Sequence, residues 1–148
     1  MPLRLLLTIC VSVFVLNAKD APNVVYILAD DLGYGDLSHA GGKAATPHCD
    51  RLAREGMRFT DSHTTSSVCT PTRYGILTGR YNWRSTLKKS VLWGLSEPLI
   101  EKKRLTVPGF LRQQGYHTAV VGKWHLGLGW QMLPDGEKRK SKTGPTKG

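Results

Sequence analysis

The chain has 148 residues, of which 40% are hydrophobic and 22% are charged, and its formal net charge is +10. This length allows one domain with a core of its own, and the composition is ordinary for a globular protein. The positive charge could suit an anionic partner, but no DNA- or RNA-binding motif accompanies it, so we expect no nucleic-acid partner. We expect solvated loops and a solvated tail where the cationic side chains cluster, at Arg84, Lys88, Lys89, Lys102, Lys103 and Arg104 and at Lys138, Arg139, Lys140, Lys142 and Lys147.

An apolar run from Leu5 to Leu16 follows Arg4 near the amino end of the chain. A run of about 12 apolar residues is too short to span a bilayer. A positive charge before the run and small residues after it, at Ala18 and Ala21, are typical of a secretory signal peptide. We therefore predict a signal peptide over residues 1–21, no stable membrane insertion after its removal, and a secreted or periplasmic location.

Strand and helix patterns alternate after this segment. The first strand, Asn23–Ala29, is a continuous β-branched and apolar run, which is typical of a strand covered on both faces in a parallel sheet. We therefore predict an α/β fold with a mostly parallel sheet and helices on both faces. The other expected elements are a helix opened by Thr46-Pro47 and ended by Gly56, a strand at 57–62, a helix at 71–77, a helix at 107–114 capped by Thr106 and closed by Gly115, and a strand at 117–121.

Two cysteines remain once the signal peptide is removed, Cys49 and Cys69. Two thiols do not make a disulfide framework. We expect Cys49, which lies in a helix-like segment, to be a small buried hydrophobic residue. A bridge between the two cysteines is possible, but it would consume Cys69, whose chemistry matters below.

Asp30 and Asp31 form the first cluster with chemical potential, directly after the first predicted strand. In open α/β sheets, ligands bind at this end of the strands. Two adjacent carboxylates stay ionised at lower cost when a cation lies between or beside them, and hard oxygen ligands favour Ca²⁺ or Mg²⁺. The pair alone would equally suit a polar turn in which an aspartate caps the next segment.

Cys69 opens the second cluster, Cys69-Thr70-Pro71-Thr72-Arg73, at the start of a predicted helix. The helix dipole and the guanidinium of Arg73 favour a thiolate at this position. In isolation, this pattern would also suit a helix cap with a buried thiol.

Lys123 and His125 form the third cluster, after the strand at 117–121. They alternate with Trp124, so in an extended chain they point to the same side. A fixed cation beside a titratable imidazole suits an anionic substrate, although a surface turn after a buried strand is an equally simple interpretation of this motif alone.

Taken together, these motifs resemble the type I, formylglycine-dependent sulfatase family, of the arylsulfatase kind. Thirteen consecutive positions, Ser67 through Gly79, fit its cysteine signature, and Gly115 through Gly127 fits a second signature. The resemblance implies an alkaline-phosphatase-like fold, with residues 22–133 as the N-terminal part of a catalytic domain and 134–148 as a basic loop or tail at a truncation point. The later Asp-Asn pair and the second Lys and His of the family have no counterpart here, so we expect this chain alone to be inactive.

The resemblance also implies roles for single residues. Cys69 would be converted to formylglycine by a formylglycine-generating enzyme or an equivalent, and its hydrate would attack the sulfur of an aryl or carbohydrate sulfate ester. Asp30, Asp31 and the modified Cys69 would hold Ca²⁺, with Mg²⁺ possible. Arg73 would hold the hydrate, Lys123 would contact the nucleophile or the sulfate, and His125 would take a proton as sulfate leaves.

Two alternatives remain open from the sequence. One is a phosphoryl-transfer enzyme of the alkaline-phosphatase-like superfamily, which would normally present Ser or Thr as the nucleophile and histidine-rich metal ligands. The other is a non-enzymatic remnant, or a fragment that binds polyanions through its basic loops.

Overall fold

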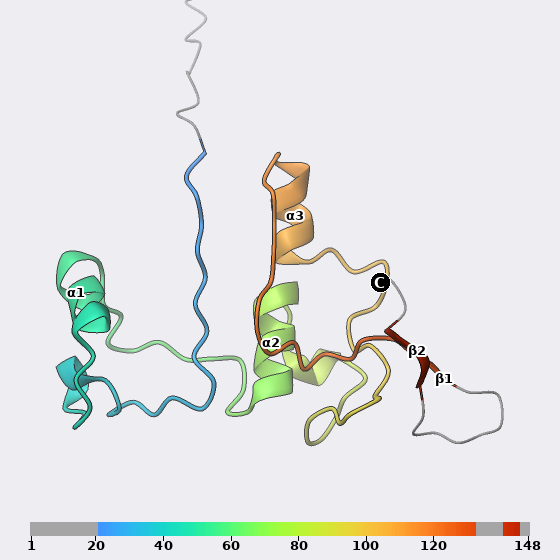
Figure 1. Ribbon diagram of the computed structural model, residues 1–148, viewed down its shortest axis with the longest axis horizontal. Coiled ribbons are helices and arrows are strands. Elements are labelled where there is room, and N and C mark those ends of the chain that lie inside the picture. Colours follow the sequence, from blue (N-terminus) through green and yellow to red (C-terminus); the bar gives the residue numbers. More distant parts are fainter. Residues whose placement is uncertain (1–20, 133–140, 146–148) are drawn as a thin grey trace, which may run out of the picture.

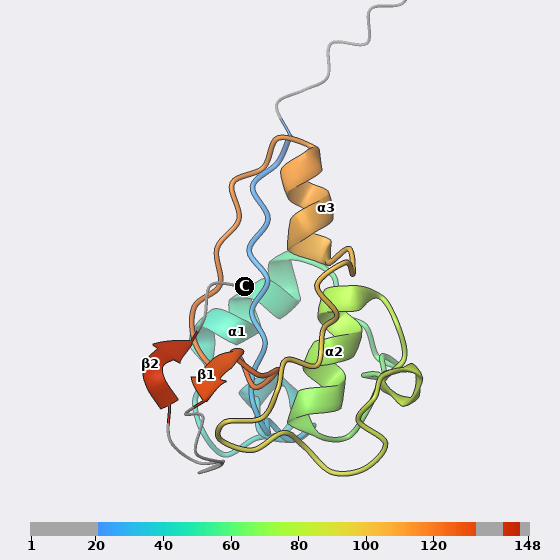
Figure 2. The same ribbon diagram turned by 90° about the vertical axis from the view of Figure 1, so that its right-hand side faces the viewer.

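The computed structural model describes residues 21–132 and 141–145, and the predicted signal peptide lies almost entirely outside them. Figures 1 and 2 show helices joined by long connections, with an extended segment at the amino end of the described chain. The elements in chain order are the 3₁₀ turn η1 (Ser38–Ala40), α1 (Pro47–Glu55), α2 (Cys69–Thr78), the 3₁₀ turn η2 (Asn82–Arg84), α3 (Val107–Gln113), β1 (Trp130–Met132) and β2 (Ser141–Pro145).

Helix α1 begins and ends where the sequence predicted, with Pro47 in its first turn and the amide of Gly56 donating to Leu52. The sequence predicts that Thr46 caps this helix, but its side chain makes no capping hydrogen bond. The Thr46 hydroxyl instead binds Ser38 and the carboxylate of Asp50, so it joins η1 to α1.

No residue of α1 is buried in this structure, so its apolar stripe is open to solvent. Leu52 is 66% exposed, and Met57, just beyond the helix, is 78% exposed. Cys49 is also exposed, so the prediction that it is a buried hydrophobic residue is wrong. No neighbouring element among the described residues covers these apolar side chains.

Helix α2 begins at Cys69 itself, two residues before the predicted start, with Pro71 in its first turn where a missing amide hydrogen costs nothing. It ends at Gly79, whose φ of 64° is in the left-handed region and whose amide donates to Gly75. Its middle enters the small core, where Tyr74, Leu99 and Leu126 are buried. The buried middle of the helix thus fixes where its first residue, Cys69, lies.

Helix α3 confirms its predicted limits to within one residue. The side chain of Thr106 accepts a hydrogen bond from the amide of Gly109 at 3.2 Å, as expected of a threonine N-cap. Gly115, just after the helix, has a φ of 87° and turns the chain back. After this turn, residues 116–123 run back in the direction opposite to the helix, toward α2 (Figure 1).

The two main predicted strands are extended but unpaired within the described residues. Segments 21–30 and 116–123 run in the same direction and lie apart from each other (Figure 1). Val25 is 82% exposed and Val121 is 97% exposed, so in this chain neither segment is covered on both faces as predicted. Residues 57–62 also form no strand. A β-strand is defined by backbone hydrogen bonds to a neighbouring strand, and these segments have none among the described residues. The mostly parallel sheet therefore stays a prediction.

The ladder that the structure does contain is antiparallel and was not predicted. β1 pairs with β2, with Trp130 opposite Pro145 and Met132 opposite Ser141. We had expected the whole segment 134–148 to be a loop or tail, and β2 differs from that expectation. Turn composition and charge do not reveal a short pairing of this kind.

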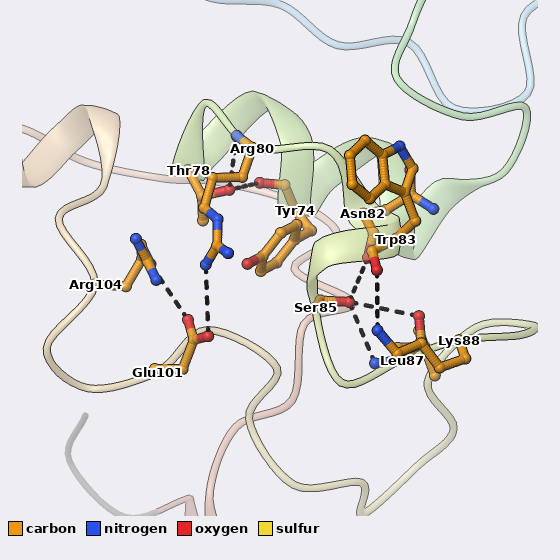
Figure 3. A network of polar contacts seen from close by, with 10 residues as sticks. All are labelled: Tyr74, Thr78, Arg80, Asn82, Trp83, Ser85, Leu87, Lys88, Glu101 and Arg104. Carbon is orange, nitrogen blue, oxygen red and sulfur yellow. Dashed lines mark hydrogen bonds and ion pairs between the residues drawn. The ribbon is translucent and has the colours of Figure 1, made fainter.

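A polar network fastens the carboxyl end of α2 to the loops that follow it (Figure 3). Glu101 forms ion pairs with two arginines, at 3.8 Å from Arg80 and 3.4 Å from Arg104. The buried hydroxyl of Ser85 closes η2, donating to Asn82 at 2.7 Å. Since Leu99 and Leu126 also share a backbone hydrogen bond, the loops around α2 are held from two sides.

Within the part of the chain that the structure describes, no helix has the length and apolar character needed to cross a bilayer.

Candidate active site

Asp30, Arg73 and Lys123 meet at the amino end of α2, although they come from distant parts of the sequence. Arg73 donates to one carboxylate oxygen of Asp30 at 2.9 Å, and Lys123 donates to the other oxygen at 2.6 Å. Arg73 also donates to the backbone carbonyl of Lys123. The three residues therefore close a ring of contacts that joins the ends of both extended segments to α2.

These contacts set the electrostatics of the cluster. The hydrogen bond from Lys123 lowers the pKa of Asp30 below its usual value of 3.8, and the hydrogen bond from Arg73 adds to this effect. In return, the hydrogen bond to Asp30 raises the pKa of Lys123 above 10.5, and the charges of Asp30 and Cys69 add to it. At neutral pH this is an ionised carboxylate held between two fixed cations, with the Cys69 side chain within electrostatic range.

A hollow of about 190 Å³ lies beside this cluster. Its lining includes Asp30, Asp31, Cys69 and Arg73, together with the hydroxyl-bearing Thr64, Ser66, Ser67 and Thr72. Asp31 has a φ of 57°, a left-handed conformation that is uncommon outside glycine but more accessible to Asp than to most residues. Such strain is often found at functional sites, so the hollow is the best candidate for an active site in the described chain.

His125 is half-buried and also has a left-handed backbone, with a φ of 56°. The positive φ means that Lys123 and His125 are not two positions on one regular extended segment, as the alternation with Trp124 had suggested. Lys123 reaches Asp30, whereas the ring Nε2 of His125 lies 2.8 Å from the carbonyl oxygen of Leu92.

Five buried side-chain polar atoms lack a hydrogen-bond partner among the described residues, and two of them belong to predicted site residues: Arg73 Nε and His125 Nδ1. Buried polar atoms are almost always paired in native proteins, by protein, water or a ligand. An unpaired donor and an unpaired ring nitrogen therefore favour a site that receives a further polar group.

The metal-ligand prediction finds only partial support in this geometry. Asp30 and Asp31 are the hard-oxygen donors that Ca²⁺ or Mg²⁺ prefers, and both line the hollow. Among the described residues, however, no group of three His, Cys, Asp or Glu side chains is gathered closely enough to hold a metal ion. Both oxygens of Asp30 are also engaged by cations. These residues fit one part of a metal site rather than a whole one.

A sequence model of the sulfatase family matches residues 22–133. The chain belongs to the sulfatase family. It is 51% identical over 109 residues to an N-acetylgalactosamine-6-O-sulfatase of Bacteroides thetaiotaomicron, a match that covers 73% of this chain and 21% of that protein. It is 46% identical over 109 residues to human arylsulfatase A, covering 73% of this chain and 22% of that protein.

A solved structure agrees with this assignment. It comes from a study of glycosaminoglycan metabolism by B. thetaiotaomicron and superposes with a TM-score of 0.71 at 49% identity, covering 80% of this sulfatase chain and 24% of that one. The fold is therefore the alkaline-phosphatase-like fold of the sulfatases, as the sequence predicted. The chain spans about a fifth of the length of the curated relatives that it matches.

The structure brings most of the predicted site residues of this sulfatase chain to one end of α2. Asp30, Arg73 and Lys123 touch one another, and Asp31 and Cys69 share the hollow with two of them. His125 instead binds the Leu92 carbonyl. No sequence signal could mark Leu92, because it acts through its backbone.

Thr70 is the other residue that sequence reasoning left without a role. It is fully buried and binds both the Leu92 and the His125 segments. Its place directly after Cys69, at the start of the helix that carries the site, is the signal that could have found it.

Proposed function

We propose that this chain carries the nucleophile and part of the anion site of an enzyme that hydrolyses sulfate esters, of the aryl or carbohydrate kind. The observation that supports this most is the convergence of Asp30, Arg73 and Lys123 beside the hollow that Cys69 lines. Membership of the sulfatase family adds the reaction class, since relatives of this chain carry the names N-acetylgalactosamine-6-O-sulfatase and arylsulfatase A.

The proposal gives the cations of the site two tasks. Arg73 is only 12% exposed, so its charge is poorly screened and can stabilise negative charge that develops beside Cys69. Lys123 is 42% exposed, which leaves it free to contact a sulfate oxygen as well as Asp30. His125 accepts the proton that must leave a hydroxyl when the sulfate ester of the enzyme breaks down.

The proposal includes formylglycine in place of Cys69 and a divalent cation, Ca²⁺ or Mg²⁺, held by Asp30, Asp31 and the modified residue. Hydrated formylglycine would supply a nucleophilic hydroxyl with a second hydroxyl for release of sulfate, and the cation would polarise a sulfate oxygen. The unpaired Arg73 Nε leaves one donor for a further polar group at the site. The cation fits less well, because only part of a ligand set is gathered among the described residues.

The proposal extends to the surroundings of the protein. The formylglycine would come from a formylglycine-generating enzyme or an equivalent, which is the one protein partner we propose. Residues 1–21 would direct the chain to a secreted or periplasmic location, residues 22–133 would form the N-terminal part of the catalytic domain, and residues 134–148 a basic segment after it.

The test is the mass of residue 69. The 148-residue chain is produced together with a formylglycine-generating enzyme and digested, and the peptide that holds residue 69 is weighed. Conversion of cysteine to the aldehyde lowers its mass by about 18 Da, and a Cys69→Ala chain serves as the control. A peptide that keeps an intact thiol under these conditions would contradict the proposal.

Activity gives a second and independent measurement. Ordinary enzymes turn over about 1–1000 times per second. We expect the converted chain to hydrolyse an aryl sulfate far more slowly, because only part of a metal-ligand set is gathered among the described residues. Turnover in that range would show that the described residues already form a whole site. A Cys69→Ala chain, which has no group to convert, sets the background rate.

A further inference from the structure

Thr70, Leu92 and His125 form a closed set of hydrogen bonds, and Thr70 directly follows Cys69 in α2. The Thr70 hydroxyl donates to the backbone carbonyl of His125 at 2.9 Å and accepts from the backbone amide of Leu92 at 3.3 Å. The Leu92 carbonyl then accepts from Nε2 of the His125 ring, 2.8 Å away. We call these three residues the Thr70 clasp.

The clasp determines which ring nitrogen of His125 carries the proton. A carbonyl oxygen only accepts hydrogen bonds, so Nε2 must be the protonated nitrogen in this contact. In the neutral ring, Nδ1 is then an acceptor, and it is buried without a partner among the described residues. The nitrogen left to take up a proton is therefore Nδ1.

The clasp also explains how a strained residue is held in place. His125 has a φ of 56°, a conformation that persists outside glycine only when the surroundings enforce it. Here the backbone carbonyl of His125 is held by Thr70 and its ring by Leu92, so both ends of the residue are fixed. Thr70 is fully buried and follows Cys69 in α2, so this restraint is attached to the helix that carries the candidate nucleophile.

We propose that Thr70 is a positioning residue, which fixes the tautomer and direction of the His125 imidazole so that Nδ1 is the nitrogen that receives a proton. The inference rests on the proposed function, in which His125 accepts a proton from a hydroxyl. In that step the O–H bond breaks, its electron pair stays on oxygen and an Nδ1–H bond forms. The Leu92 carbonyl keeps its hydrogen bond to Nε2–H throughout and stabilises the imidazolium that results.

The experiment records the tautomer of His125 by long-range ¹H–¹⁵N spectra of the ¹⁵N-labelled chain at a pH where the imidazole is neutral. The chain contains five histidines, so a His125→Gln variant assigns the signal. We expect a single Nε2–H tautomer in the unmodified chain and in Thr70→Ser, which keeps the hydroxyl. Thr70→Val, which keeps the shape but removes the hydroxyl, should give a mixture of both tautomers.

The same helix offers a matched control. Thr72 is also buried, at 7% exposure, and its hydroxyl donates to the carbonyl of Ser66 at 2.7 Å, away from the clasp. Thr72→Val should weaken the helix in the same general way while leaving the His125 tautomer unchanged. An equal change in Thr72→Val and Thr70→Val would overturn the proposal, as would no change in Thr70→Val.

Two further measurements test the proposal if the Thr70→Val chain does not fold. The unmodified chain must show His125 as the Nε2–H tautomer, and an Nδ1–H signal or a mixture there overturns the proposal without any variant. The Leu92 amide must also exchange slowly with solvent in the unmodified chain and in Thr70→Ser, since Thr70 is its acceptor. These spectra are taken with an intact Cys69, so their outcome is separate from the mass test of the proposed function.

Discussion

Asp30 is the residue around which the candidate site is organised, since both of its carboxylate oxygens are bound by cations. The sequence predicted that it is a metal ligand, together with its neighbour Asp31, and the structure places it in an ion-pair network. A carboxylate between Arg73 and Lys123 also binds a further cation more weakly than an isolated carboxylate does, because its charge is already compensated. Any divalent cation at this position has to compete with Lys123 for Asp30.

The first prediction at the residue scale concerns the pKa of Asp30. Replacing Lys123 with Met removes the hydrogen bond that lowers this pKa most, so we expect the pKa of Asp30 to rise toward its usual value of 3.8. The measurement is the pH titration of the Asp30 carboxyl carbon by NMR. Lys88→Met is the matched control, because Lys88 donates to the backbone carbonyl of Trp83 and not to a carboxylate.

The same contact predicts how stability depends on pH. The folded pKa of Asp30 is lowered, so its contribution is present above about 3.8 and is lost as the pH falls through the folded value. The folded pKa of Lys123 is raised, so its contribution is present below about 10.5 and is lost as the pH rises through the folded value. The Lys123→Met chain should show a smaller loss of stability in acid than the unmodified chain, and an identical acid profile would contradict this view.

Helix α2 is the element that positions the site, and its two ends are fixed by different means. Its amino end, at Cys69, meets Asp30 through Arg73, while its carboxyl end is stopped by Gly79. Helices α2 and α3 were both predicted closely because proline in the first turn and glycine after the last turn act locally. The strands could not be confirmed in the same way, since a strand depends on a neighbour that sequence alone does not place.

A prediction at the element scale concerns Gly127, which follows the buried Leu126. Its φ is 79°, and a Cβ atom at this position would overlap the carbonyl of Glu97 and lie 2.7 Å from Cα of Pro98. Gly127→Ala should therefore add a backbone clash to the cost of a left-handed alanine, and destabilise the chain by about 2–4 kcal/mol. Urea unfolding followed by circular dichroism measures the change.

Gly79→Ala is the matched control for this variant. Gly79 has a similar φ of 64°, but a Cβ there would meet nothing within 4 Å. Its replacement should cost only about 1 kcal/mol, from the left-handed conformation alone. Equal losses in the two variants would mean that the contact between residue 127 and Glu97 does not constrain the loop.

At the scale of the whole molecule, the described chain has a small core and much exposed apolar surface. Tyr74, Leu99 and Leu126 are its buried apolar residues, whereas Val25, Ile27 and Val121 are each more than four-fifths exposed. The sequence predicted these segments as buried strands from their apolar runs, and the matched part makes up about a fifth of the length of the relatives. Such exposed apolar segments favour self-association.

The prediction at this scale is that the chain binds an apolar dye such as anilinonaphthalene sulfonate through the two extended segments. Val25→Thr together with Val121→Thr should lower dye fluorescence and self-association, because each valine offers about 1.5–3 kcal/mol on burial. Val107→Thr, at a position 47% exposed at the start of α3, is the control. Dye binding that is unaffected by the paired change would place the apolar surface elsewhere, for example on α1.

The sequence alone determined the family, and it predicted the limits of α2 to within two residues and those of α3 to within one. These features depend on local patterns: the Cys69–Arg73 motif, the Thr106 cap and the glycine that ends each helix. Only the tertiary structure decided that Asp30 binds Lys123, 93 residues away, and that His125 is oriented by the backbone carbonyl of Leu92. Contacts of this kind depend on where distant segments are packed, and a backbone carbonyl, which every residue has, leaves no trace in the sequence.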